Sequence, residues 1–221
     1  MRMPKLPLTS SRCTSHAAAK WILDRLVAAS ALAVLSPLLA IVALSIRLAA
    51  PGSVLFRQTR IGFEGNPFEM VKFRTMTNAC GDSGQMLPDG NRLTRIGCLM
   101  RRTSIDELPQ LWNVLKGDMY LVGPRPLLPE YLPRYDDVQC RRHEVKPGMT
   151  GWAQVNGRNA LSWEQKFELD VWYVDHQGFW LDVKILWLTV LQVLRRDGIS
   201  QAGHATMPEF VGSPALRTRA K

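Results

Sequence analysis

The segment from Arg101 to Leu111, RRTSIDELPQL, holds the residues best suited to chemistry. Two adjacent carboxylates, Asp106 and Glu107, follow a pair of arginines at the expected start of a helix. Carboxylates among guanidinium groups indicate an anionic substrate that is handled by nucleophilic or acid/base chemistry. A structural explanation competes, because Ser104 and Glu107 have the spacing of a capping box, and acidic residues in a first turn complement the helix dipole.

Pro109 weakens this structural explanation. In a helix capped by Ser104, the proline would remove an early backbone hydrogen bond. We therefore expect a distorted first turn in which both carboxylates face solvent. Taken alone, the segment leaves catalysis and helix capping open.

Several cations could bind phosphate oxygens beside the carboxylates. Lys72 and Arg74 alternate along a predicted strand and so point to one face, and Arg125 stands in a Pro-Arg-Pro turn. Guanidinium groups in fixed positions bind phosphate through paired hydrogen bonds. Each cation alone is more often ordinary surface charge. His143 and His176 have no ligand-like spacing with other His or Cys residues, which argues against a structural zinc site.

The elements around these residues follow from local patterns. Residues 54–58 and 68–73 are predicted strands around a turn at 62–67, and residues 77–92 form a predicted polar loop. The apolar spacing from Leu108 to Lys116 predicts a helix that Gly117 ends. Residues 122–133 hold four prolines and are predicted to be a stiff, largely non-helical turn, and the glycines of residues 146–158 indicate another loop.

Two further helices are predicted near the C-terminus. Ser162 opens a capping box, and that helix is expected to run to about Tyr173. Residues 179–196 are strongly apolar but too short between charges to span a bilayer. With Trp180 and Trp187 this second helix could lie in a membrane interface, and packing in a core is an equal alternative.

An uncharged apolar run extends from Leu26 to Ile46. At about 1.5 Å per residue, a helix of this length just spans a bilayer core of about 30 Å. Three basic residues lie close to the run on each side, so the positive-inside rule predicts no orientation. They are Arg12, Lys20 and Arg25 before it, and Arg47, Arg57 and Arg60 after it.

Ser36-Pro37 interrupts the run near its middle. Proline removes a helical hydrogen bond, and the Ser36 hydroxyl can satisfy the carbonyl that is left free. We therefore predict a re-entrant helix that kinks, turns back and keeps both ends on one side of the membrane. The alternative is an ordinary spanning helix with a tolerated proline.

Composition limits the classes of protein to which this chain can belong. The chain has 221 residues, of which 46% are hydrophobic and 21% charged, and this excludes wholesale disorder, collagen and coiled coil. Lys and Arg number 28 against 19 Asp and Glu, and the net charge of +9 favours an anionic partner. Nucleic acid, a phosphorylated small molecule and an acidic membrane all satisfy that condition. Four dispersed cysteines favour a reducing compartment.

Several segments together resemble one family, the monotopic polyprenyl-phosphate phosphoglycosyl transferases, also called bacterial sugar transferases. The resemblance extends from Lys20 to about Gly212 and fits the short, core-only members. It rests on KWILDR before the run with Ser36-Pro37, and on VLFRQTRIG, KFRTM, RRTSIDELPQLWNVLKGDMYLVGPRP and KPGMTGWAQVNGR.

The resemblance implies a small α/β (α+β-like) catalytic domain on the cytoplasmic face of the bacterial inner membrane, with a re-entrant helix and interfacial amphipathic helices. Residues 1–20 would be a loose basic N-terminus, 21–50 the membrane helix, 51–212 the catalytic domain and 213–221 a basic tail. The enzyme would transfer a sugar-1-phosphate from a UDP-sugar to undecaprenyl phosphate and release UMP.

Roles for individual residues also follow from the resemblance. Asp106 would be the nucleophile and a Mg²⁺ ligand, and Glu107 the base that assists the lipid phosphate. Lys72, Arg74 and Arg101 would bind phosphate, and Arg125 the nucleotide.

Two other classes of protein compete with this interpretation. A membrane-tethered nucleic-acid-binding protein would explain the charge but not the paired acids, and we find no recognition motif for nucleic acid. A noncatalytic membrane scaffold would not need Asp106 and Glu107. The sugar, the glycan pathway and the oligomeric state stay open.

Overall fold

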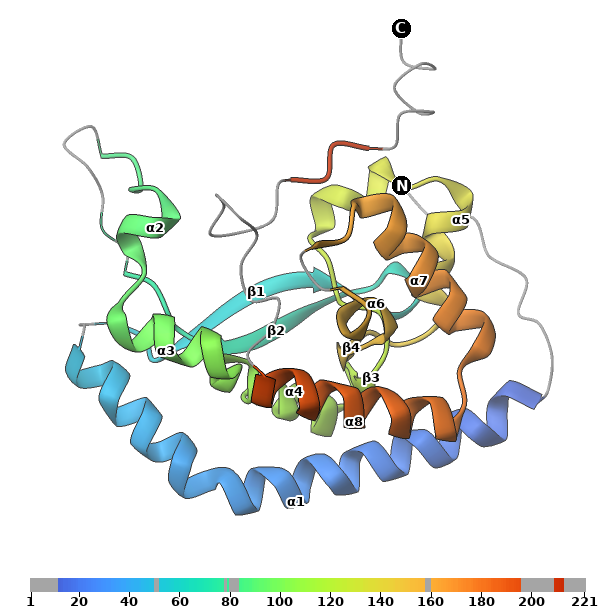
Figure 1. The fold of residues 1–221 in the computed structure, drawn as a ribbon, viewed down its shortest axis with the longest axis horizontal. Coiled ribbons are helices and arrows are strands. Elements are labelled where there is room, and N and C mark those ends of the chain that lie inside the picture. Colours follow the sequence, from blue (N-terminus) through green and yellow to red (C-terminus); the bar gives the residue numbers. More distant parts are fainter. Residues whose placement is uncertain are drawn as a thin grey trace, which may run out of the picture.

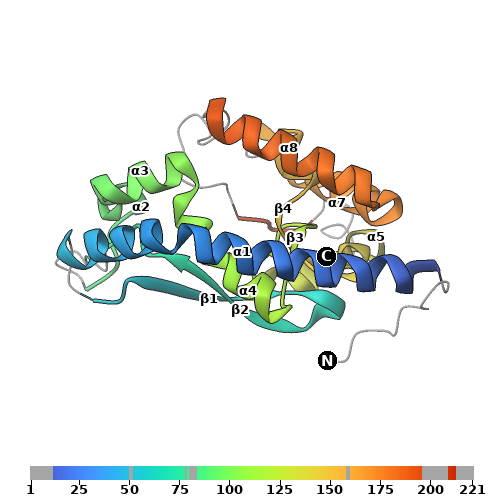
Figure 2. The ribbon, with the colours of Figure 1, turned by 90° about the horizontal axis from the view of Figure 1, so that it is seen from below.

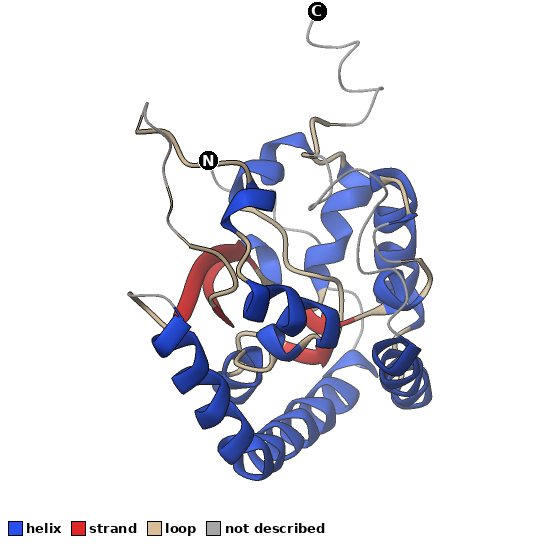
Figure 3. Cartoon of the chain, turned by 60° about the vertical axis from the view of Figure 1, so that its left-hand side comes forward, coloured by secondary structure: helices blue, strands red, loops and turns tan. Residues whose placement is uncertain are grey.

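One long helix, α1 (Arg12–Ala49), runs along one side of all the other elements (Figures 1 and 2). The computed structural model describes residues 12–49, 52–77, 79, 84–157, 160–195 and 209–212, and the side chains of residues 12–17 and 89 are outside this description. Helices and short strands are mixed, as the α+β-like prediction requires (Figure 3). The helix begins at Arg12, so residues 12–20 are not the loose terminus that we predicted. The predicted tail, residues 213–221, lies outside the described residues.

Helix α1 is bent near its middle, and both arms rise towards the rest of the chain (Figure 1). Pro37 lies inside the helix and cannot donate to the Ala33 carbonyl, four residues earlier. The Ser36 hydroxyl donates to that same carbonyl at 2.8 Å, as we predicted. The helix bends without interruption, however, and does not fold back on itself as a hairpin. Its segment Ala18–Ala49 is long and apolar enough to cross a membrane.

The predicted hairpin is confirmed. Strands β1 (Leu55–Ile61) and β2 (Pro67–Phe73) are antiparallel, with Leu55 opposite Phe73 and Ile61 opposite Pro67. A short 3-10 turn, η1 (Phe63–Gly65), joins them. Gly65 has a φ of 75°, which glycine adopts without steric cost.

Helices α2 (Asp89–Arg92) and α3 (Arg95–Thr103) precede the paired carboxylates. We predicted neither: α2 lies within the predicted polar loop, and α3 follows it. The Thr94 hydroxyl caps α3 by accepting a hydrogen bond from the Gly97 backbone N–H. This capping signal is hard to recognise in the sequence, because glycine at position 97 is unfavourable in a helix. Helix α4 (Gln110–Lys116) is confirmed and ends at Gly117, whose φ is 91°.

The second half of the chain contains a small parallel sheet and several helices. Strands β3 (Tyr120–Val122) and β4 (Gly148–Thr150) pair in parallel. We predicted a turn from residue 122 and a loop over residues 146–158, and neither strand, because three-residue strands show no alternation. The other elements are η3 (Pro129–Arg134), α5 (Asp137–Cys140), η4 (Arg141–Glu144), α6 (Trp152–Val155), α7 (Trp163–His176) and α8 (Phe179–Arg195). The predicted capping box of α7 is present, between Ser162 and Gln165.

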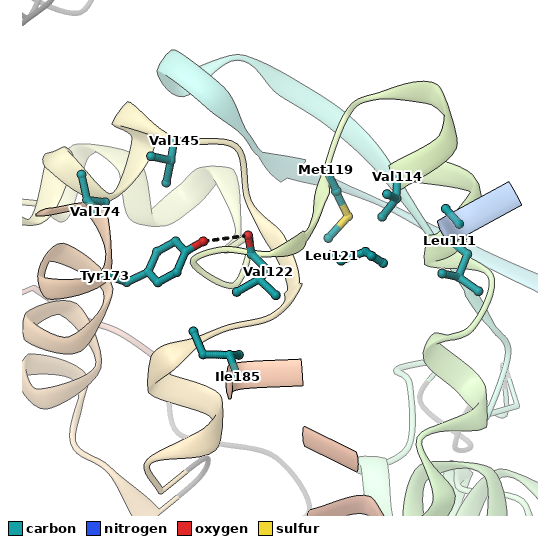
Figure 4. Packing of buried hydrophobic residues seen from close by; sticks show 10 residues of the cluster. Leu111, Val114, Met119, Leu121, Val122, Val145, Tyr173, Val174 and Ile185 are labelled. Atoms are coloured by element: carbon teal, nitrogen blue, oxygen red, sulfur yellow. Dashed lines mark hydrogen bonds between the residues drawn. The ribbon is translucent and has the colours of Figure 1, made fainter. Parts of the chain in front are cut away.

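The main core joins α1 to the small sheet and to helices α4, α7 and α8 (Figure 4). Its buried side chains are Ala28, Leu111, Val114, Met119, Leu121, Val122, Val145, Tyr173, Val174 and Ile185. The Tyr173 hydroxyl donates to the Val122 carbonyl at 3.2 Å. Lys20 of α1 is buried and pairs with Asp182 of α8. The N-terminal arm of the apolar helix is therefore fixed rigidly to the rest of the protein.

Helix α8 buries Ile185 but exposes most of its other large apolar side chains. Trp180 is 80% exposed and Trp187 is 63% exposed, so core packing accounts for only one side of the helix. Seen from below, α8 and α3 lie on the same face of the molecule as α1 (Figure 2). This arrangement favours the interfacial alternative for α8, since an apolar face of this size needs a nonaqueous neighbour.

Candidate active site

The paired carboxylates lie in a short irregular turn between α3 and α4. Ser104 ends α3 in the left-handed region, with φ 56° and ψ 16°, and its side chain makes no capping hydrogen bond. A 3-10 turn, η2 (Ile105–Glu107), follows, and α4 begins only after Pro109. The capping-box explanation is therefore wrong. The expected distortion is present, and a left-handed nonglycine residue costs about 1 kcal/mol or more.

Glu107 is held by two cations from distant parts of the chain. Lys72 of β2 donates to its Oε1 at 2.9 Å, and Arg125 donates to both carboxylate oxygens. These positive charges hold the pKa of Glu107 far below its usual range, although burial opposes the shift. Glu107 is therefore an anion with both oxygens engaged, and its side chain is 24% exposed, which is less open to solvent than we predicted.

Asp106 has the opposite environment although it is the adjacent residue. It is 8% exposed, and no group among the described residues donates a hydrogen bond to its carboxylate. Burial and the negative charge of Glu107 raise its pKa, while Lys72, Arg101 and Arg125 oppose the rise. The prediction that it faces solvent is also wrong. A desolvated carboxylate without hydrogen bonds is a stronger nucleophile than a solvated one.

The structure collects most of the predicted cations around this pair. Lys72, Arg101 and Arg125 all act electrostatically on Asp106, and the Nε of Arg101 also donates to the Thr75 hydroxyl at 3.1 Å. Arg74 is not among the cations that act on Asp106.

The side chain of Arg74 lines a groove beside the C-terminal end of α1, with Ile46, Ala49 and Thr94. That Lys72 and Arg74 share one face stays a prediction.

Asn113 positions Lys72, a role that we did not predict. Its side chain is fully buried and bonds to the backbone of β2 as a neighbouring strand would. Nδ2 donates to the Glu69 carbonyl at 2.7 Å, and Oδ1 accepts from the Val71 backbone N–H at 3.1 Å. Lys72 follows Val71 directly. The one signal in the sequence is an asparagine between the apolar residues Leu111, Trp112, Val114 and Leu115.

Arg125 is positioned by a buried ion pair that we also did not predict. Arg142 donates to the Arg125 carbonyl at 2.7 Å, and it pairs with Asp170 of α7 at 2.7 and 3.1 Å. Arg142 is 3% exposed and Asp170 is 4% exposed. The stiff prolines on each side of Arg125 and this anchor fix the guanidinium that holds Glu107.

Comparison with known proteins places this site in a family. Residues 15–196 match the model of the family described as "Bacterial sugar transferase". The chain belongs to the bacterial sugar transferases. It is 61% identical over 168 residues to an uncharacterized sugar transferase, EpsL, of Bacillus subtilis, and the match covers 76% of this chain and 83% of that protein.

Two further relatives of this sugar transferase have named activities. Both are UDP-glucose:undecaprenyl-phosphate glucose-1-phosphate transferases, one from Escherichia coli and one from Caulobacter vibrioides, and each is 41% identical. The matches cover 76% and 80% of this chain. The sugar transferase spans 39% of the length of the first and 70% of the second.

The carboxylates of the transferase could bind Mg²⁺ only together with a substrate. Among the described residues, no group of three or more His, Cys, Asp or Glu side chains could hold a metal ion. Asp106 still has an uncommitted carboxylate, while Glu107 is occupied by cations. Mg²⁺ is commonly bound through one or two carboxylates together with substrate phosphates. The residues therefore fit a Mg²⁺ ion that arrives with a diphosphate, and they do not form a preformed cage.

Proposed function

We propose that this sugar transferase moves a sugar-1-phosphate from a UDP-sugar to undecaprenyl phosphate. The products would be UMP and a polyprenyl-diphosphate-sugar, the first membrane-bound intermediate of a glycoconjugate or exopolysaccharide. The names of the relatives support the two substrates. The contrast between Asp106 and Glu107 carries the proposal, because it provides a desolvated nucleophile next to an anion that holds cations in place.

The first step is attack by an Asp106 oxygen on the β-phosphorus of the donor. The bond from that phosphorus to the bridging oxygen breaks, UMP leaves with the bonding electrons, and Asp106 carries the phosphosugar as an acyl phosphate. Lys72, Arg101 and Arg125 lie where they can offset the negative charge of the diphosphate. Mg²⁺ bound to Asp106 and the diphosphate would add further charge compensation.

The second step transfers the phosphosugar to the lipid. An oxygen of the lipid phosphate attacks the same phosphorus, and the Asp106 carboxylate is released. We had expected Glu107 to act as a base here. Its low pKa and its bonds to Lys72 and Arg125 do not favour proton transfer, so we assign it instead to positioning these two cations.

The membrane arrangement supports the same reaction. Helix α1 presents exposed apolar side chains around its bend, including Val34 at 77% and Ile41 at 64% exposure. We propose that the bend enters one leaflet of the bacterial inner membrane from the cytoplasmic side and returns, which makes the protein monotopic. Asp106 would then lie within reach of both a water-soluble donor and a lipid phosphate.

Thiol labelling tests this topology in intact cells. In a cysteine-free background, Ser15→Cys and Arg57→Cys should both be shielded from a membrane-impermeant reagent until the cells are lysed. Labelling at position 15 alone would establish a spanning helix. Pro37→Ala restores the backbone donor to Ala33 and is expected to increase labelling at position 15.

The reaction itself is tested with purified full-length protein. Radiolabelled UDP-glucose, UDP-galactose and N-acetylated UDP-sugars are incubated with undecaprenyl phosphate in lipid nanodiscs and Mg²⁺. We expect UMP release and lipid labelling with at least one donor, and neither product without the enzyme. A protein that binds membranes but releases no UMP with any donor would be a scaffold and would contradict the proposed function.

A further inference from the structure

Arg60 lies beside Arg125, at the end of β1. The next residue, Ile61, donates its backbone N–H to the Leu127 carbonyl at 3.0 Å, which joins β1 to the Pro-Arg-Pro turn. One nitrogen of the guanidinium, Nη2, donates to the Gln58 side chain at 2.6 Å. The Nε is buried and has no hydrogen-bond partner among the described residues. A buried donor without an acceptor is unfavourable, so this nitrogen is available to an acceptor on a bound ligand.

Arg60 and Lys166 of α7 both lie near Arg125. Two carboxylates that act on these cations also bind other side chains: Glu107 binds Lys72 and Arg125, and Asp170 binds Arg142. Burial and the positive charge of Arg125 lower the pKa of Arg60 to about 10 and that of Lys166 to about 8. Tyr131, Glu130 and Glu107 oppose this lowering at Arg60.

The position of these two cations indicates which anion they would bind. Arg101 ends α3, which contacts α1 and α8, the elements of the apolar face. Arg60 instead lies where β1 contacts η3, and Lys166 lies on α7, which packs on η4 and α6. In Figure 1, α7 rises away from α1 while α8 lies close to it. Arg60 and Lys166 therefore lie beside Arg125, on elements that point away from the apolar face.

We propose that Arg60 and Lys166, together with Arg125, form the subsite for the nucleoside-bound phosphate of the donor, which departs as the nucleoside monophosphate. This inference rests on the proposed function and adds two residues to it. The Nε of Arg60 donates to a phosphate oxygen, and Lys166 adds charge from α7. Lys72 and Arg101 are left for the phosphorus that reacts with Asp106.

Binding of UMP tests the subsite separately from turnover. The titrations use full-length Asp106→Asn protein in nanodiscs, which cannot form the covalent product. We expect Arg60→Gln and Lys166→Gln each to weaken UMP binding about tenfold, because each removes a charge-assisted contact. Arg57→Gln is the matched control: it lies on the same strand, its exposed pair with Glu69 is remote from Arg125, and UMP affinity should stay within about twofold.

Steady-state kinetics show whether Arg60 binds the phosphate of the UDP-sugar or that of undecaprenyl phosphate. With Asp106 restored, Arg60→Gln should raise the KM for the UDP-sugar and leave the KM for undecaprenyl phosphate unchanged. The opposite result would assign these cations to the acceptor and overturn the proposal. Equal UMP affinity in Arg60→Gln and Arg57→Gln would overturn it as well.

Two further controls keep the outcomes separate. Arg60→Lys keeps the charge but lacks the Nε donor, and this variant should bind UMP with intermediate affinity. If Arg60→Gln does not fold, Arg60→Lys and Lys166→Gln together test the subsite. Wild-type protein that neither binds nor releases UMP would refute the proposed function itself. Wild-type protein that binds UMP through other residues would refute only the subsite.

Discussion

Asp106→Asn is expected to abolish both UMP release and covalent labelling by a donor that carries ³²P in its β-phosphate. An amide is not a nucleophile towards phosphorus, so the first displacement cannot occur. The rate of UMP release is expected to fall at least about a thousandfold, because the adjacent carboxylate, Glu107, is already bound by Lys72 and Arg125 and cannot replace the nucleophile. The measurement is gel analysis of acid-quenched, donor-only incubations, with Mg²⁺ present and then chelated.

Glu107→Gln is the informative companion. It removes the anion that holds Lys72 and Arg125 but leaves the nucleophile, so slow labelling should persist. Label retained by Asp106→Asn would exclude Asp106 as the sole nucleophile. Turnover that requires both substrates together, without label, would replace the covalent route with direct displacement. Label that survives chelation would remove Mg²⁺ from the first step.

The pH dependence of labelling follows from the raised pKa of Asp106. Only the ionised carboxylate attacks, so the labelling rate should fall as pH decreases through a pKa above that of an ordinary aspartate. The folded state also binds this proton more tightly than the unfolded state, so ionisation of Asp106 lowers stability as pH rises. Asp106→Asn should therefore be at least as stable as wild type at neutral pH, which separates lost chemistry from lost fold.

Asp170→Ala is expected to lower the free energy of unfolding by about 3–5 kcal/mol, because it leaves the Arg142 guanidinium buried, charged and without its carboxylate. Arg142 also holds the Arg125 carbonyl, so the KM for the UDP-sugar should rise in the protein that remains folded. Urea unfolding followed by tryptophan fluorescence measures the stability.

The neighbouring pair provides a matched control for this variant. Arg141 and Asp175 connect the same two elements, η4 and α7, but their side chains are 36% and 43% exposed. Asp175→Ala should cost less than about 1 kcal/mol, because solvent screens an exposed pair. Similar losses in the two variants would show that burial is not the reason for the stability of the Arg142–Asp170 pair.

The sequence by itself determined the elements whose signals are local. The hairpin of β1 and β2, the end of α4 at Gly117 and the capping box of α7 each depend on residues a few positions apart, and all three are confirmed. The bend of α1 is also local, because Pro37 removes one bond and Ser36 replaces it at the same carbonyl. The paired carboxylates and their cations were likewise recognisable as residue types suited to phosphate chemistry.

Only the tertiary structure decided what each carboxylate does. Asp106 and Glu107 are neighbours with the same charge, and nothing local distinguishes them. The distinction comes from Lys72, 35 residues before Glu107, and Arg125, 18 residues after it. Both bind Glu107, while Asp106 is buried and receives no hydrogen bond from the part of the chain that the structure describes. Such contacts depend on how β2 and the turn after β3 pack against η2, and the spacing of these residues along the chain does not show which carboxylate each cation binds.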